Sequence, residues 1–497
     1  MCRAKIGILF LLTSLCTFAA AAALPWPVMP ESNAHLIGNS YGQFQCYYLD
    51  DCVPYAHSGI DIMVPPGARV YAVKPGYVKA ILTTSAESHW RVVIGDSSGT
   101  QECEALMYAH LLQSSITDSA GLHVGDYVET GQYIGNIVYF PVEEFHHIHF
   151  SRIRYAGTAA DWAESGYWPF VGDPLDILDP NLDPDPPVIE NAYGDQLLAF
   201  SYNEVAYYLP AGAELYGDVD IICHVYDYIN DYEHKVAPWG IEYKIEGDSS
   251  IPWTNGICFS AELGAYSEIY SEILYYYQDD ATCNTLGDYN NRSYYFNITS
   301  SNGDSVIEYA DILECWHTGY FHNGEYKISI RAYDHAGNEA VDSMYVIVTN
   351  QFQLTGKVVG DDAPGGLSDA EVTIVSSGLS DITEADGDFG IPGVGGGSQL
   401  VSVRRVGYTP LDTTIMMNQA QDVTLTMTEL PYICGDVDQS GSVNILDITF
   451  LIGYLYKGGP APQYPGSADA NNSGSVNLLD VTFLISYLYK GGPVPEC

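Results

Sequence analysis

Four residues, His57, Asp61, His147 and His149, have the types and spacing of a metal-binding set. A histidine followed by an aspartate four residues later can supply one nitrogen and one oxygen ligand. A distant His-x-His pair in an apolar run can supply further nitrogen ligands. Zinc prefers such donors in a tetrahedral arrangement, and a catalytic zinc site keeps its fourth position for water. The pattern therefore indicates a zinc site with three protein ligands.

An extended segment must present the His-x-His pair. Successive side chains of a β-strand point to opposite faces, so His147 and His149 leave the same face of a sheet. One can then bind metal while the other reaches the water or the substrate. Residues 24–178 alternate short apolar runs with glycine and proline turns, without a long helical period. We therefore expect an antiparallel β domain over this range.

Three motifs resemble, in the same order, those of the lysostaphin-like zinc endopeptidases, which cut peptide cross-links in bacterial cell walls. They are His57-x-x-x-Asp61, Tyr108-Ala109-His110-Leu111 and His147-x-His149-Phe150. The resemblance implies that His57, Asp61 and His149 bind zinc, which would lower the pKa of bound water toward ~7 and polarise a peptide carbonyl. It implies that His110 and His147 are catalytic residues beside the metal. One would help to deprotonate the water and both could stabilise the oxyanion and the departing amine; which does which stays open.

Two positions depart from the family's pattern. His146 stands where the family usually has proline, which could alter the rim of the site or confuse the ligand register, and Ile148 replaces leucine. Three further histidines match no motif, and we interpret them as ordinary surface or packing residues: His35, His89 and His123. Some relatives have lost ligands and act as activators or scaffolds. Since every ligand is present here, catalysis is favoured over a non-catalytic wall-binding or adhesion protein.

The C-terminal part contains an internal repeat, in which the segment from Asp436 to Asp447 recurs from Asp469 to Asp480. Oxygen ligands at loop positions 1, 3, 5, 7, 9 and 12, with glycine at position 6, describe a calcium loop. Position 7 contributes a backbone carbonyl. The predicted calcium ligands are Asp436, Asp438, Ser440, Ser442, Asn444 and Asp447 in the first loop and Asp469, Asn471, Ser473, Ser475, Asn477 and Asp480 in the second.

Each loop precedes a helical run, and a duplicated loop and helix without an incoming helix resembles a type I dockerin. The resemblance implies calcium-dependent folding and a cohesin-like partner. The pairs Ile445-Leu446 and Leu478-Leu479 occupy positions that contact the partner in dockerins, so either repeat could dock; alternatively, the module merely caps the chain. Cys434 and Cys497 flank the repeats, and we hypothesise that they form a disulfide.

The remaining segments divide the chain into domains. Four prolines within residues 179–187 exclude a helix or central strand and indicate a linker. Residues 188–350 resemble an immunoglobulin- or fibronectin-like sandwich, and residues 352–430 resemble the carboxypeptidase regulatory-like sandwich, an accessory unit without catalysis. The expected fold class is mostly β and multidomain, with a small α-helical calcium-loop module over residues 434–497.

The N-terminal residues and the net charge lead us to expect a protein that acts outside the cell. Residues 1–23 have the basic start, apolar run and small residues of a secretory signal peptide. No later stretch is long and apolar enough for a transmembrane anchor. The formal charge of −45 argues against nucleic-acid binding and is typical of a soluble extracellular protein. We expect a bacterial protein that is secreted or at the cell surface and acts on peptidoglycan or on another protein.

Overall fold

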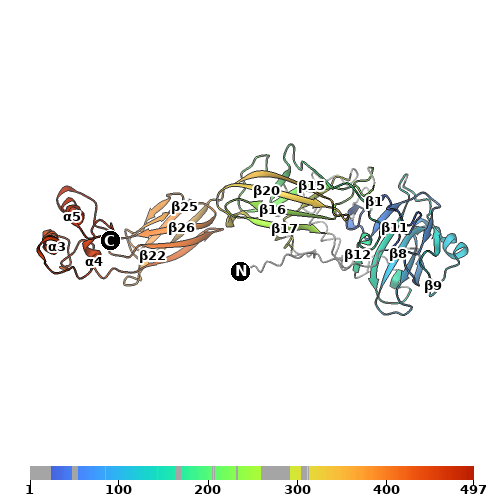
Figure 1. Ribbon diagram of the computed structural model, residues 1–497, viewed down its shortest axis with the longest axis horizontal. Helices are drawn as coiled ribbons and strands as arrows, with labels where there is room; N and C mark the ends of the chain where they lie inside the picture. The colour runs from blue at the N-terminus through green and yellow to red at the C-terminus, as the bar shows by residue number, and fades with distance from the viewer. Residues whose placement is uncertain are drawn as a thin grey trace. The chain divides into compact units, whose positions relative to one another are not determined.

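The computed structural model describes residues 24–46, 54–83, 86–142, 144–159, 161–163, 170–203, 205, 207–230, 233–258, 292–303, 311 and 313–497. The expected signal peptide lies outside these residues. The protein is mostly β, with a small helical region at its C-terminus, which confirms the expected fold class (Figure 1). The chain forms two compact units. The first comprises Met1–Ala213, Val219–Trp316 and Tyr326–Val346, and the second comprises Glu214–Asp218, His317–Glu325 and Ile347–Cys497.

The part of the first unit before residue 179 is built on one antiparallel sheet with the strand order β1-β4-β11-β8-β7-β6-β9, and β12 pairs with β11. Two small sheets, β10-β5 and β2-β3, accompany it. The strands are β1 (Ile37–Asn39), β2 (Phe44–Cys46), β3 (Pro54–Ala56), β4 (Ile60–Met63), β5 (Arg69–Tyr71), β6 (Gly76–Leu82), β7 (Trp90–Gly95), β8 (Cys103–Leu111), β9 (Tyr127–Val128), β10 (Tyr133–Asn136), β11 (His147–Tyr155) and β12 (Phe170–Gly172). Short helical turns are η1 (Glu87–His89), η2 (Ser115–Ser119), η3 (Asp161–Ala163) and η4 (Pro174–Asp176).

The centre of this sheet is strongly apolar. Ile60, Ile62, Tyr108, Ile148 and Phe150 are fully buried and lie on the three neighbouring strands β4, β8 and β11. Burying one such side chain contributes about 1.5–3 kcal/mol, so these strands form a rigid base for the polar residues that they also carry.

Residues 179–187 form an irregular connection, as their prolines predict. The strands that follow form two antiparallel sheets, β13-β15-β14 with β18 on β15, and β17-β16-β20-β21. They are β13 (Val188–Glu190), β14 (Leu198–Tyr202), β15 (Asp218–Tyr226), β16 (Gly240–Glu246), β17 (Ile251–Cys258), β18 (Tyr295–Asn297), β19 (Trp316–His317), β20 (Gly324–Tyr333) and β21 (Glu339–Val348).

The second unit contains two sheets around one apolar core, with the orders β25-β22-β28 and β24-β23-β26-β27. The strands are β22 (Phe352–Gly360), β23 (Glu371–Ile374), β24 (Ser380–Ile382), β25 (Asp388–Val394), β26 (Gly397–Arg404), β27 (Leu411–Met417) and β28 (Gln421–Met427). Two short segments from before residue 347 also belong to this unit. Asn350 explains their position, because its side chain bonds both to Gly217 and to Thr318 of η7 (Thr318–Tyr320).

The C-terminal module consists of α3 (Ile445–Lys457), α4 (Pro465–Ala468) and α5 (Leu478–Lys490) (Figure 1). The apolar faces of α3 and α5 pack together through buried residues such as Ile448, Leu451, Val481 and Leu484. A disulfide joins Cys434 to Cys497, which confirms the hypothesis made from their positions. Within the described residues, no helix is both long and apolar enough to cross a membrane.

Candidate metal centre

Strand pairing brings Asp61 and His149 together. The two residues lie directly opposite each other in the antiparallel pair β4–β11, with His147 opposite Met63 two residues further along. Directly paired residues point to the same face, with Cβ atoms about 4.5–5.5 Å apart. The pairing register therefore sets one carboxylate beside one imidazole on the surface of a rigid sheet.

His57 reaches the same place from the loop that enters β4. Gly59 lets this loop press against β11, because a Cβ at Gly59 would lie 2.3 Å from the carbonyl oxygen of Phe150. Backbone hydrogen bonds from His57 N to Gln43 O and from Gly42 N to His57 O fix the other side of the loop. The sequence His-Ser-Gly-Ile-Asp thus places its histidine and aspartate around one point.

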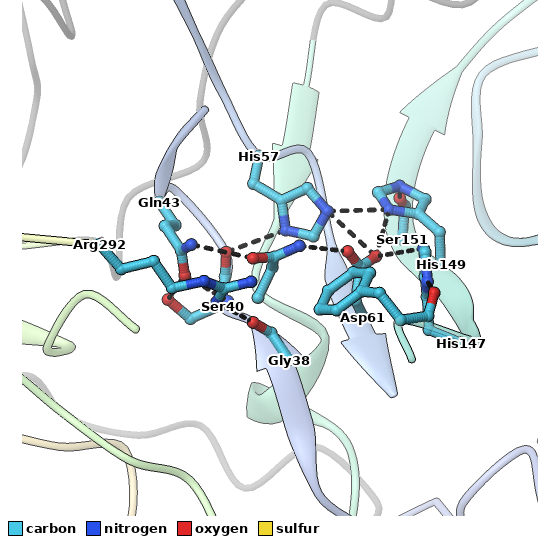
Figure 2. A network of polar contacts seen from close by, with 11 residues as sticks. Gly38, Ser40, Gln43, His57, Asp61, His147, His149, Ser151 and Arg292 are labelled. Atoms are coloured by element: carbon cyan, nitrogen blue, oxygen red, sulfur yellow. Dashed lines mark hydrogen bonds and ion pairs between the residues drawn. The ribbon is translucent and has the colours of Figure 1, made fainter. Parts of the chain in front are cut away.

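Three possible ligand atoms converge in this site (Figure 2). His57 Nε2 lies 2.9 Å from His149 Nδ1 and 3.2 Å from Asp61 Oδ1, and His149 Nδ1 lies 3.0 Å from the same oxygen. Ligands about 2.0–2.1 Å from a tetrahedral zinc ion are about 3.3 Å apart, so the spacing suits such an ion.

The hydrogen bonds behind the rings also fit a metal. The Ser40 carbonyl can only accept a hydrogen bond, so His57 Nδ1, 3.0 Å away, carries a proton, which leaves Nε2 as the ring atom that can bind a metal. This nitrogen faces the Asp61 carboxylate, at 3.2 Å from Oδ1. A backbone carbonyl behind a metal-ligating histidine is the usual means of fixing its tautomer.

The protonation states point the same way. Burial lowers the pKa of His149 to about 4, even though Asp61 opposes the shift. Burial would raise the pKa of Asp61, but the nearby rings of His147 and His57 and its hydrogen bonds hold it well below its usual value. A neutral imidazole and an ionised carboxylate are the forms in which these side chains bind metals.

Two neighbours that no sequence pattern indicated position the ligands. The Asn39 side-chain amide donates to Asp61 Oδ2 at 2.6 Å and in turn accepts from Gln43 Nε2 at 3.0 Å. Ser151 Oγ lies 2.9 Å from His149 Nε2. Ser151 could have been found because it shares a strand face with His149, whereas Asn39 comes from β1 and carries no such signal.

His110 enters the site from an irregularity in β8. Trp90 pairs with Leu111 and Arg91 with Ala109, so His110 is an extra residue in the pairing of β7 with β8, and its φ of 64° is left-handed. A bulge of this kind turns a side chain out of its regular direction, and such strained backbone often occurs at functional sites.

His110 and His147 lie next to each other beside the ligand set. Their ring centroids are 4.6 Å apart, and Phe140 lies 4.7 Å from each ring. His147 Nε2 is 3.6 Å from Asp61 Oδ1, while its Nδ1 bonds to the Phe145 carbonyl and His110 Nδ1 bonds to the Ser88 carbonyl. Burial lowers the pKa of both rings, in His110 well below its ordinary value.

Four further histidines of this domain lie outside the set around Asp61. His35 bonds to the Pro30 carbonyl and His123 lies on the surface near Asp126, as ordinary residues would. His146 packs against Tyr139, while His147 is the residue near Asp61. His89 is a packing residue whose ring lies 5.2 Å from that of His110, so it borders the site.

The two C-terminal loops have the same internal geometry. Asp436 Oδ2 accepts from Gly441 N at 2.7 Å, and Asp469 Oδ2 accepts from Gly474 N at the same distance. The last aspartate of each loop, Asp447 or Asp480, accepts from backbone nitrogens at both ends of its loop. Asp436, Asp438 and Asp447 have carboxylate oxygens within 4.8 Å of one another, the arrangement a calcium loop requires.

Asn444 and Asn477 cap the helices that follow. Their side-chain oxygens accept from Leu446 N at 2.9 Å and from Leu479 N at 2.8 Å. Leu446 and Leu479 themselves are 58% and 61% exposed, so the two repeats present equivalent apolar side chains at the starts of α3 and α5.

Comparison with protein families assigns both ends of the chain. Residues 55–162 match Peptidase family M23, and residues 434–489 match the Dockerin type I domain. A search of curated proteins gives no match.

Several solved structures are similar over part of the chain. A zinc-containing peptidase from Vibrio cholerae is 22% identical, with 27% of this chain and 37% of that chain covered and a TM-score of 0.21. The lysostaphin catalytic domain from Staphylococcus simulans is 22% identical, with coverages of 25% and 85% and a TM-score of 0.19. A type II cohesin–X-dockerin complex from Acetivibrio cellulolyticus is 20% identical, with coverages of 29% and 97% and a TM-score of 0.16. The chain spans about a third of the length of the Vibrio peptidase and of Helicobacter pylori Csd3, at 37% and 36%.

Proposed function

Because the chain contains a lysostaphin-like peptidase M23 domain and a type I dockerin domain, we propose that it is a zinc metalloendopeptidase held to a partner by its dockerin. The observation that carries the proposal is the convergence of His57 Nε2, Asp61 Oδ1 and His149 Nδ1 on one point. The substrate that we propose is the peptide cross-link of bacterial peptidoglycan, which fits a secreted enzyme of this family.

In the proposed site, His57, Asp61 and His149 hold zinc. When bound there, zinc polarises the peptide carbonyl and lowers the pKa of a water molecule toward ~7. His147 and His110 each have their Nδ1 bonded to a backbone carbonyl, so the Nε2 of each neutral ring is free to accept a proton.

His147 is the better candidate for the general base, because its Nε2 lies 3.6 Å from the ligand oxygen Asp61 Oδ1. It would take a proton from the attacking water and could return it to the departing amine. The neutral His110 ring, 4.6 Å from that of His147, would line the same side of the site, next to the oxyanion and the departing amine. Phe140 and Phe145 pack on the His147 ring and exclude water from one side of it.

The two C-terminal loops would bind calcium and thereby order the dockerin. Each gathers carboxylates that repel one another without a cation, so calcium should be needed for folding. A cohesin-like module would bind this domain and bring the peptidase to a larger extracellular assembly or to the cell surface. Secretion itself is expected from the signal peptide features of residues 1–23.

Digestion of purified peptidoglycan sacculi tests the proposal. Wild-type protein should release soluble fragments with new amino termini, and identification of these termini gives the cleaved bond. His147→Ala should lower the rate about 10²–10⁴-fold, the range typical of a lost general base, while His123→Ala, a change at an exposed histidine, should not.

The competing proposal is a non-catalytic wall-binding or adhesion protein with the same folds. It predicts that wild type and His147→Ala bind sacculi equally and that neither releases new amino termini. Digestion of an unrelated protein but not of sacculi would keep the peptidase and change the substrate.

A further inference from the structure

Three buried aspartates meet where the linker joins the β-sandwich of the first unit. Asp183, Asp227 and Asp334 are 6%, 1% and 3% exposed, and each offers a carboxylate oxygen within 4.8 Å of the others. None of the three forms an ion pair with a described residue. Three carboxylates in such a place repel one another unless they are protonated or share a cation.

The fold brings them together from three separate segments. Asp227 directly follows β15, and Asp334 directly follows β20 in the other sheet. Asp183 comes from the linker, which is carried to this end because Val188, the first residue of β13, pairs with Tyr226, the last residue of β15. The cluster is therefore specified by strand register and is not an accident of one acidic loop.

The Asp183 side chain lacks the partners that a buried carboxylate needs. Its Oδ2 is buried and makes no hydrogen bond, while the carboxylate is otherwise met only by backbone N–H groups, those of Asp185, 3.4 Å from Oδ1, and of Asn230. Buried carboxylate oxygens are rarely left without a partner, so this atom indicates a missing ligand.

Hydrogen bonds from Asn338 and Tyr228 surround the cluster, and no cationic side chain is among them. Asn338 Nδ2 donates to the Asp183 carbonyl at 2.8 Å and to Asp334 Oδ2 at 2.7 Å, which ties the linker to the β20–β21 turn. Tyr228 N donates to Asp227 Oδ1 at 2.8 Å. Burial and the carboxylates of Asp183, Asp334 and Asp185 raise the pKa of Asp227 to about 8.

We propose that Asp183, Asp227 and Asp334 bind one calcium ion, which fastens the linker to the sandwich. All donors are oxygens, which selects a hard cation, and a site assembled from a linker and two strand ends suits the irregular geometry that calcium accepts better than the near-ideal octahedron that magnesium demands. This site is separate from the two C-terminal calcium loops and does not depend on the proposed peptidase activity.

Calcium content of the full chain tests the proposal. Wild type, Asp183→Asn, Asp227→Asn and the control Asp342→Asn, at an exposed position of β21, are dialysed against calcium and analysed for bound metal. Asp183→Asn and Asp227→Asn should each bind one calcium fewer per chain than wild type and the control. Equal calcium content in all four proteins would overturn the proposal, and a site filled by magnesium in preference to calcium would overturn its choice of ion.

Thermal unfolding gives a second test, because the effect of one substitution on the unfolding temperature should reverse when calcium is added. Without calcium and at pH 9, above the pKa of about 8 of Asp227, Asp227→Asn should unfold at a higher temperature than wild type because one repelling charge is gone, and with calcium at the same pH it should unfold at a lower temperature. If the variant is more stable under both conditions, the cluster shares protons and holds no metal. If Asp227→Asn does not fold, Asp183→Asn decides, because its position lies in the linker outside the sandwich core.

Discussion

The chemistry of the metal centre depends on which ring nitrogens carry protons. Backbone carbonyls of Ser40, Ser88 and Phe145 accept from the Nδ1 atoms of His57, His110 and His147, so Nε2 is the atom that each of these rings presents to the site. His149 is reversed, with Nδ1 toward Asp61 and Nε2 toward Ser151. The residues behind the histidines therefore decide which atom can bind metal or accept a proton.

The low histidine pKa values predict how activity changes with pH. Because burial lowers the pKa of His147 below 6.5, the ring stays neutral and able to accept a proton at pH 6.5 and somewhat below. The acid limb of kcat/KM should therefore have its midpoint below pH 6.5, with folding and zinc content checked at each pH. A midpoint at or above pH 6.5 would contradict the proposed state of the base.

At the scale of single residues, the sequence predicted the histidines that gather around Asp61 but not the neighbouring residues that contact them. His57, Asp61, His110, His147 and His149 stand in motifs with characteristic spacing, and the structure brings them together. Asn39 and His89 reach the site through tertiary packing from segments without any such motif. A local sequence motif cannot reveal such tertiary contacts.

At the scale of elements, the bulge at His110 is the feature that alternation could not predict. A regular β8 would direct residues 109 and 110 to opposite faces, whereas the extra residue opposite Trp90 and Arg91 changes the direction of His110. The strand itself follows from the apolar run, but a bulge depends on pairing with β7, which a single segment does not reveal.

Two substitutions separate the backbone role of His110 from its imidazole. A left-handed φ suits glycine and strains alanine, so His110→Gly should be more stable than His110→Ala by about 1 kcal/mol in unfolding free energy. Both should lose activity because both lack the ring. Equal stability of the two variants would show that the bulge relaxes, and full activity in either would remove His110 from the mechanism.

The cluster of three aspartates likewise depends on strand pairing that a single segment does not reveal. Alternating strands were expected after residue 187, but the meeting of Asp183, Asp227 and Asp334 requires knowledge of which strand ends lie together. Aspartates spread over about 150 residues give no periodic signal, and only the fold makes them a cluster.

At the scale of the whole molecule, two chemically different ends share one chain. The N-terminal part offers nitrogen and oxygen donors suited to zinc, and the C-terminal module offers oxygen donors suited to calcium. The internal repeat made the C-terminal module predictable, since the same spacing recurs in Asp436–Asp447 and Asp469–Asp480. The disulfide between Cys434 and Cys497 closes this module around both loops.

The near-equal exposure of Leu446 and Leu479 predicts that either repeat can meet the partner. For a cohesin module that binds the wild-type chain, Leu446→Ala or Leu479→Ala alone should weaken binding by only about twofold, since one of two equivalent modes survives. The double variant should lose binding. Isothermal titration in calcium measures all three, and loss of binding on substitution of Leu446 alone would show a single docking mode.

Zinc content is the most direct test of the account. Metal-replete wild-type protein should contain one zinc ion per chain by elemental mass spectrometry. His147→Ala should keep it, since His147 lies outside the ligand set, and His149→Ala should lose most of it. A wild-type protein without zinc under these conditions, or a His149→Ala variant with the full amount, would contradict the proposed centre.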